Sequence, residues 1–151
     1  EELPRLDSMT HKVADVHGQR EPRLHDVRKV FVGFQQELTS HMMKEEQILF
    51  PYIREMSIAL AAGKPLPPMH CGSVANPIRQ MMHEHENAGA ALSAIRKRTS
   101  DYELSDDTCP TFAGLYKDLQ ALEADLHEHV FLENNILFPC AEEAENSSGK
   151  V

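Results

Sequence analysis

Two eleven-residue blocks of this 151-residue sequence repeat each other, at residues 41–51 (HMMKEEQILFP) and 129–139 (HVFLENNILFP). Each block opens with a histidine that a glutamate follows four residues later, first His41 and Glu45 and then His129 and Glu133. Residues four apart in an α-helix lie on the same side, one turn apart, so both side chains can reach one point. Imidazole nitrogens and carboxylate oxygens bind metal ions, and a carboxylate can bridge two of them. The repeat therefore predicts a metal site built from both blocks.

Apolar residues recur every three or four positions in three stretches, and the histidines and glutamates above fall in the same rows. The rows are Val27, Val30, Phe34, Leu38, His41, Glu45, Ile48, Tyr52; Val74, Ile78, Met81, His85, Ala88, Leu92, Ile95; and Phe112, Leu115, Leu119, Leu122, Leu126, His129, Glu133, Ile136, Cys140. This spacing is typical of helices that bury one stripe in an antiparallel bundle. A carboxylate in such a stripe costs several kcal/mol unless a cation compensates its charge. The two glutamates therefore favour a cation between them, with His85 as a third imidazole.

The alternative is that these histidines are satisfied core residues beside solvated glutamates. For a single His-x-x-x-Glu pair this alternative is the better interpretation, because such pairs are common on exposed helix faces. Two pairs in register, on two buried stripes and with a third histidine, favour the metal site instead.

Four helical segments must position these residues, and we expect them at about 3–17, 24–62, 74–98 and 110–143. Gly18 with Pro22 ends the first segment, and Gly63 with the prolines that follow it ends the second. No stretch alternates as a β-strand would, so the predicted fold is all-α, an antiparallel up-down four-helix bundle. We expect one domain over 1–145 and a disordered tail over 146–151.

The composition excludes several classes of function. A formal charge of −9 argues against a nucleic-acid or anionic-membrane partner, and no apolar run is long enough to span a bilayer. The cysteines Cys71, Cys109 and Cys140 form no Cys-x-x-Cys pair, so they predict neither a zinc nor an iron–sulfur site. With no secretory signal in the sequence, we expect reduced thiols and a cytoplasmic protein.

The blocks at 41–51 and 129–139, together with the segment EHENAG at 84–89, resemble the bacterial repair-of-iron-centres proteins. These are hemerythrin-like di-iron proteins that help to restore iron–sulfur clusters after nitrosative or oxidative stress. The resemblance implies two non-haem iron ions joined by an oxo bridge. It implies that Glu45 and Glu133 bridge the irons, and that His41, His85 and His129 are terminal ligands.

The resemblance also concerns residues around the iron site. Carboxylates lie near the iron of this family at the positions of Glu37 and Glu84. Glu37 and Asp125 either orient His41 and His129 or are surface acids. Full-length members of the family also carry a small N-terminal domain with a cysteine pair, which is absent from this sequence. A further histidine of the family, on the first helix, would lie just upstream of Glu1, so we expect this chain to lack it.

The family pattern has a histidine at the position of His17, which makes it a further candidate ligand. Geometry argues against this role. His17 ends the first predicted helix, whereas His41 lies well inside the second, roughly 25 Å farther along the bundle at 1.5 Å per residue. His17 can join the site only if the turn lies elsewhere than the glycine and proline suggest.

Three functions fit such a site. The resemblance favours a stress-response protein that repairs iron–sulfur clusters by donating iron, with damaged or apo iron–sulfur proteins as partners, rather than a conventional enzyme. The alternatives are a hemerythrin-like carrier or sensor of O₂ or NO, and a di-iron NO or peroxide reductase. Iron transfer, reversible gas binding and turnover with an electron donor distinguish the three.

Overall fold

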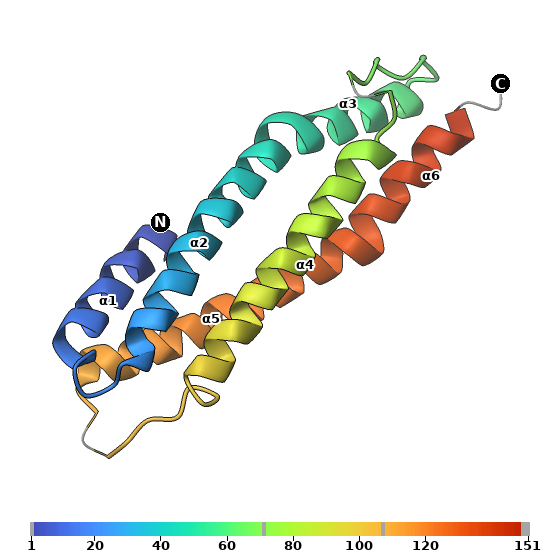
Figure 1. The fold of residues 1–151 in the computed structure, drawn as a ribbon. Coiled ribbons are helices and arrows are strands. Elements are labelled where there is room, and N and C mark those ends of the chain that lie inside the picture. The colour runs from blue at the N-terminus through green and yellow to red at the C-terminus, as the bar shows by residue number, and fades with distance from the viewer. Residues whose placement is uncertain (1, 71, 107, 149–151) are drawn as a thin grey trace. The chain divides into compact units, whose positions relative to one another are not determined.

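The computed structural model describes residues 2–70, 72–106 and 108–148, and within them every regular element is a helix (Figure 1). The elements are α1 (Glu2–His17), α2 (Arg23–Lys44), the π-helix η1 (Glu45–Leu49), α3 (Phe50–Ala61), α4 (Ala75–Arg98), α5 (Pro110–Leu132), the π-helix η2 (Glu133–Leu137) and α6 (Phe138–Ser148). Because η1 and η2 continue the helices on either side of them, the chain forms four long helical segments. The all-α prediction and the four segments are confirmed.

The helix ends follow the signals in the sequence. Helix α1 ends at His17, and the N–H of Gly18 still bonds to the Ala14 carbonyl oxygen at 2.8 Å. Helix α3 ends at Ala61, and the positive φ of Gly63, 63°, lets the Lys64 N–H donate to the carbonyl of Ala59. The last segment is longer than predicted, because α6 includes residues 146–148 of the expected tail. Residues 149–151 of that tail lie outside the described residues.

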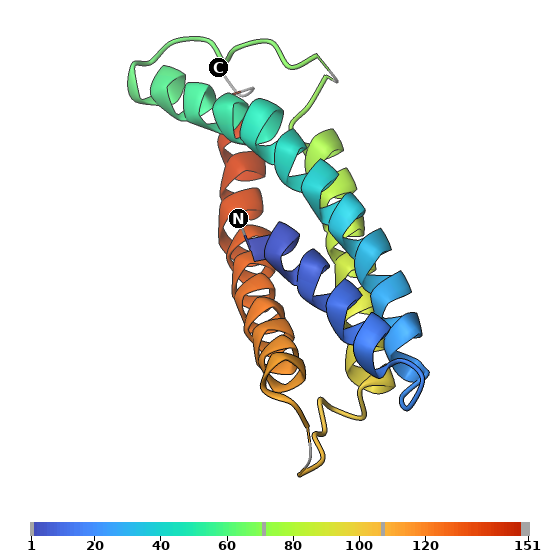
Figure 2. The same ribbon diagram turned by 90° about the vertical axis from the view of Figure 1, so that its left-hand side faces the viewer.

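The chain divides into two compact units. The first contains residues 1–38 and 87–127, and the second contains residues 39–86 and 128–151. In the first unit, α1 runs antiparallel to the beginning of α2, as Figure 2 shows. The guanidinium of Arg28 ties the two helices together by donating to the Asp7 carboxylate and, at 2.9 Å, to the hydroxyl of Thr10.

A buried carboxylate fastens the loop that follows α4 in the first unit. Glu123 accepts hydrogen bonds from Arg96 Nε at 3.1 Å and from the Tyr102 hydroxyl at 2.9 Å. Tyr102 is buried although its φ is +60°, and Ser100 and Asp101 also have positive φ. Three such non-glycine residues in a row are unfavourable, so the contacts of Tyr102 must offset a local backbone cost. Burial, followed by the hydrogen bond to Glu123, raises the pKa of Tyr102 well above its ordinary value.

The second unit has its own apolar core, in which α3 packs against α6. Its buried members are Leu49, Tyr52, Met56, Val74, Ile78, Met81, Phe138 and Ala141. Glu145 of α6 connects the beginning of α4 to this core, since its carboxylate accepts from the Ser73 hydroxyl at 2.6 Å and from the Val74 N–H at 2.9 Å.

The π-helices correct one part of the predicted pattern. In each, the N–H of the following phenylalanine bonds five residues back, from Phe50 to Glu45 and from Phe138 to Glu133. A proline follows each phenylalanine, and its ring cannot fit the straight helix, so we attribute the wider turn to the proline. The extra residue shifts all later positions by about 100° around the helix.

The predicted rows therefore fail at three positions beyond the two glutamates, although Tyr52 is buried as expected. Ile48 and Ile136 were expected inside, but they are 55% and 53% exposed, and Cys140 is exposed as well. Leu49, one residue after Ile48, is buried in place of it.

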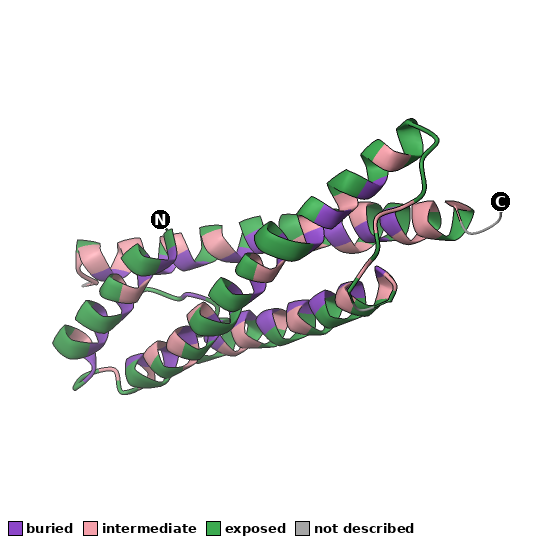
Figure 3. Ribbon diagram, turned by 90° about the horizontal axis from the view of Figure 1, so that it is seen from above, coloured by how far each residue is buried: buried purple, intermediate pink, exposed green. Residues whose placement is uncertain are grey.

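Up to the π-helices, buried positions recur along one side of each helix and exposed positions along the other (Figure 3). This pattern is typical of helices that share a core with neighbours and contact water on the opposite face. None of the helices described combines the length and the apolar composition that crossing a bilayer requires.

We predict that Glu123→Ala lowers the free energy of unfolding by about 2 kcal/mol. The change leaves the buried Tyr102 hydroxyl without its acceptor, whereas Arg96 is partly exposed and can bind water instead. Urea denaturation measures the effect. Glu128→Ala, at an exposed position of the same helix, is the control and should change stability by about 0.5 kcal/mol at most. Equal stabilities of the two variants would contradict the role of Glu123.

Candidate metal centre

Four buried side chains converge inside the second unit. His41 lies in the last turn of α2, Glu45 opens η1, His85 lies in α4 and Glu133 opens η2. One nitrogen or oxygen atom of each lies within 4.8 Å of all the others, a spacing that suits a single metal ion. The structure thus brings together four of the five residues with the strongest predicted role as ligands.

The fifth residue, His129, approaches the same two glutamates from another side. Its Nε2 lies 3.2 Å from Glu133 Oε1 and 3.8 Å from Glu45 Oε2. The other oxygens of the two carboxylates, Glu45 Oε1 and Glu133 Oε2, lie 3.1 Å from His41 Nε2 and His85 Nε2 respectively. Each carboxylate therefore presents one oxygen to the His41–His85 pair and the other to His129.

The two carboxylates thus have two sides, an inner position and an outer position. The inner position is bounded by His41, His85, Glu45 Oε1 and Glu133 Oε2, and the outer position by His129, Glu45 Oε2 and Glu133 Oε1. The side chains of His41 and His85 are each only 4% exposed, whereas that of His129 is 43% exposed. The two positions differ in both ligand number and access to water.

The hydrogen bonds of the outward-facing ring nitrogens determine which atoms of His41 and His85 face the inner position. His41 Nδ1 lies 2.9 Å from a carboxylate oxygen of Glu84, and His85 Nδ1 lies 2.9 Å from Asn134 Oδ1. Carboxylate and amide oxygens only accept hydrogen bonds, so each Nδ1 carries the ring proton. In a neutral imidazole the Nε2 lone pair then points inward, which is the arrangement that metal-binding histidines need.

The residues present therefore fit a cation. The two Nε2 atoms lie 3.1 Å apart, and the buried oxygens Glu45 Oε1 and Glu133 Oε2 accept no hydrogen bond. Four lone-pair atoms meet in a dry space where no donor faces them, an arrangement that is repulsive without a positive charge.

Surrounding charges set the protonation state of His41 in the metal-free protein. Burial alone would raise the pKa of Glu84, but hydrogen bonds from Lys44, Gln80 and His41 lower it to about 2. Burial likewise opposes protonation of His41, yet its contacts with Glu45 and Glu84 outweigh burial and raise its pKa. When no metal is bound, a proton on His41 thus supplies the positive charge that the site requires.

Other residues with a predicted role lie elsewhere. Glu37 and Asp125 are exposed residues of the first unit, which agrees with the surface-acid alternative. His17 also belongs to the first unit, where its Nε2 lies 3.1 Å from Cys109 Sγ. Glu84 is the exception, because one of its carboxylate oxygens lies 2.9 Å from His41 Nδ1.

The sequence did not reveal three residues that contact His85 or Glu84 and hold them in place. Asn134 holds His85, Lys44 pairs with Glu84, and the ring of Phe138 stacks on that of His85 at a centroid distance of 6.0 Å. Asn134 is one of the places where the two repeated blocks differ, since the first block has Glu46 there. This difference between the two blocks was the feature of the sequence that could have drawn attention to Asn134.

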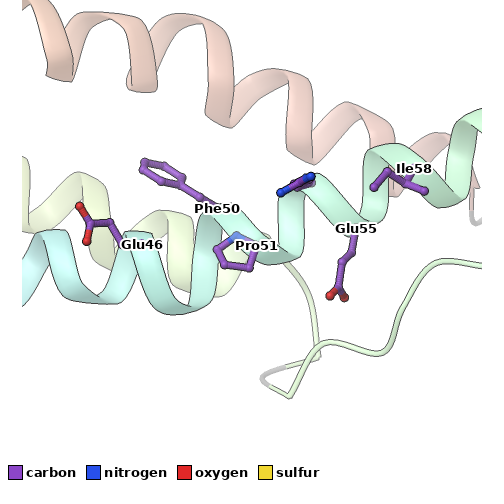
Figure 4. A pocket seen from close by; sticks show the side chains of 6 residues that line it. Glu46, Phe50, Pro51, Glu55 and Ile58 are labelled. Carbon is purple, nitrogen blue, oxygen red and sulfur yellow. The ribbon is translucent and has the colours of Figure 1, made fainter.

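A surface hollow on the outer side of α3 is separate from this centre. It is lined by Glu46, Phe50, Pro51, Arg54, Glu55 and Ile58. Figure 4 shows that these side chains come from η1 and α3, and none of the converging ligand residues is among them. Its lining offers no imidazole.

We predict that bound metal stabilises the protein more at pH 8 than at pH 6. At pH values between the ordinary histidine pKa of about 6.5 and the raised pKa of His41, the metal-free protein keeps a proton on His41. That proton stabilises the metal-free fold at low pH, and the stabilisation is lost as pH rises through the raised value. A metal ion binds only the neutral ring of His41, so metal binding becomes more favourable as His41 loses its proton. Melting temperatures of metal-loaded and metal-free protein should therefore diverge with pH, and a constant or narrowing difference would refute the competition.

Comparison with known proteins places this geometry in a family. The Hemerythrin HHE cation binding domain matches residues 1–141. The sequence is 37% identical over 141 residues to the "Iron-sulfur cluster repair protein YtfE" of Citrobacter koseri, and 40% identical to the protein of that name from Edwardsiella ictaluri. Each match covers 93% of this chain, which spans only 58% of the length of these relatives. This chain belongs to the hemerythrin HHE cation binding domain family.

Proposed function

We propose that this chain holds two iron ions and donates iron to damaged or apo iron–sulfur proteins. The observation that carries the proposal is the pair of buried glutamates, each with one oxygen in the inner position and one in the outer position. Two carboxylates that face two places at once suit a pair of metal ions better than a single one. Mixed histidine and carboxylate ligands favour iron over calcium or magnesium.

The ligands would divide unequally. His41 and His85 would hold one iron in the inner position, and His129 alone would hold the other in the outer position, with Glu45 and Glu133 shared between them. Iron prefers five or six ligands, so the outer ion would depend on water or another small ligand to complete its shell. An exposed and under-coordinated ion is the one that an acceptor protein can take.

The names of the relatives support repair as the use of this iron. Proteins called "Iron-sulfur cluster repair protein" share 37% to 40% of their aligned residues with this chain. In such a role the iron is cargo, and the residues of the chain hold it, keep it from precipitating and release it. Lys44, Glu84 and Asn134 keep the histidine rings in the orientation for binding.

A carrier or sensor of O₂ or NO is the second candidate, and the exposure of His129 favours it equally. A small molecule that reaches the outer position would meet an iron with a vacant coordination site. The two functions differ in whether iron leaves the protein.

The unequal division predicts different iron contents for ligand variants. After anaerobic loading with Fe²⁺, the unmodified chain should hold two irons. His129→Ala should keep about one, because the inner position retains its own ligands, and Glu45→Ala and Glu133→Ala should lose most of both. Metal analysis after gel filtration measures the content. His127→Ala, an exposed neighbour on the same helix, is the control and should behave as the unmodified chain does. Full iron content in both glutamate variants would rule out the shared carboxylates.

Repair predicts transfer of iron. When the iron-loaded chain is mixed anaerobically with a ferredoxin stripped of its cluster, together with sulfide, the visible absorption of the new cluster should appear over minutes to hours. The iron-loaded chain should outperform Fe²⁺ held by a chelator of similar affinity, and Glu45→Ala protein should give only the rate of free iron. If the iron stays on the chain while O₂ or NO binds reversibly, the carrier function replaces the repair function.

A further inference from the structure

A thiol and an imidazole meet in the first unit, where the end of α1 lies against the beginning of α5. Cys109 Sγ lies 3.1 Å from His17 Nε2, within hydrogen-bond distance. Both residues are half-buried. The ring of Phe112 lies on one side of His17, with the two centroids 5.4 Å apart, and limits the orientations open to the imidazole.

The helix ends on either side favour transfer of the thiol proton to the imidazole. His17 is the last residue of α1, and a positive imidazolium is stabilised at the negative end of a helix. Cys109 immediately precedes α5, and its carbonyl accepts the N–H of Ala113 as the helix begins. A negative thiolate is stabilised by the first N–H groups of such a helix. The two helix dipoles therefore act in the same direction on this pair.

Space for a small reactant lies beside the pair. A cavity of about 140 Å³ is lined by Glu21, Arg23, Glu103, Thr108 and Phe112, among others. Thr108 immediately precedes Cys109, and Phe112 contacts the His17 ring. Glu21 and Arg23 bind each other at 2.7 Å. Such a space suits a small polar molecule.

We propose that Cys109 and His17 form a reactive thiol site that is oxidised by small hydroperoxides. The thiol proton passes from Sγ to His17 Nε2, and the thiolate attacks the terminal oxygen of the peroxide. An S–O bond forms and the O–O bond breaks, so the sulfur loses two electrons and the peroxide gains them. The leaving oxygen takes the proton from His17, which yields water or an alcohol and leaves a sulfenic acid on Cys109. This site uses none of the residues of the proposed metal centre.

Alkylation rates test the pairing in the intact chain. Iodoacetamide labelling at pH 7, resolved by mass spectrometry, compares Cys109 with the exposed Cys140 of the same molecule. Cys109 should react faster than Cys140 although it is less exposed, because His17 accepts its proton. His17→Gln should slow Cys109 at pH 7 by about tenfold, because an ordinary thiol is only a few per cent ionised there.

The controls separate this pairing from a general disturbance. In His17→Gln the Cys140 rate should stay unchanged. His25→Gln is the matched control, because the His25 ring lies against Gly18 beside the same helix end, and it should leave Cys109 unaffected. A Cys109 rate that does not exceed the Cys140 rate, or that is unaltered by His17→Gln, would overturn the proposal.

Oxidation is tested with micromolar hydrogen peroxide and dimedone, which traps sulfenic acid. The adduct should form on Cys109 in preference to Cys140 and should decline in His17→Gln. Methionine oxidation in the same spectra reports any radical chemistry from bound iron, which would not depend on His17. Iron content should be the same in His17→Gln protein. Loss of iron with unchanged Cys109 chemistry would mean that His17 serves the metal, and the proposal would fail while the proposed iron function stood.

Discussion

Mutual repulsion among lone-pair atoms is the constraint on which the second unit depends. Two imidazole nitrogens and two carboxylate oxygens face one another in a space that water does not reach. Such a group would separate in a flexible structure, so the surrounding residues must hold it. The apolar core that joins α3, α4 and α6 fixes the helices, and Glu84 and Asn134 fix the rings. The stability of the apolar core offsets this repulsion. It keeps the four groups together until a cation, either a proton on His41 or a metal ion, neutralises the site.

The same constraint explains why the site is not symmetrical although its sequence is repeated. The first block places His41 against Glu84, and α4 adds His85 to the same side. Among the described residues, His129 is the only histidine within ion-pair distance of Glu45 Oε2 and Glu133 Oε1, and it remains open to water. Duplication of a motif thus supplies two similar half-sites, and His85 of α4 makes one half tighter than the other.

The sequence was sufficient for the fold and for the identity of the converging residues, because both depend on local rules. Glycine and proline set the helix ends, and the four-residue spacing puts His41 and Glu45 on one side. The exposure of Ile48 and Ile136 could not be predicted from three- and four-residue periodicity, since a π-turn inserts a residue before the pattern resumes. The Phe-Pro pair in both blocks was the visible warning.

Contacts between helices were harder to foresee. In the sequence, Asn134 and Lys44 could not be distinguished from ordinary surface residues. Their partners, His85 and Glu84, lie 49 and 40 positions away in the chain. His17 showed the opposite difficulty. The family pattern suggested a ligand, whereas the helix end places this residue beside Cys109. Periodicity determines which face of a helix is buried, but the partner across the interface depends on how the helices pack.

The order of the ligands along the chain has a consequence for synthesis on the ribosome. His41, Glu45 and His85 emerge first, and His129 and Glu133 follow more than forty residues later. A nascent chain that has reached residue 100 offers one carboxylate and two imidazoles, which is only part of the group of side chains that converge in the folded protein. The centre can therefore form only after the second block has left the ribosome and α5 has folded back, so that metal captured at that moment closes a loop of about ninety residues and locks the last helix in place.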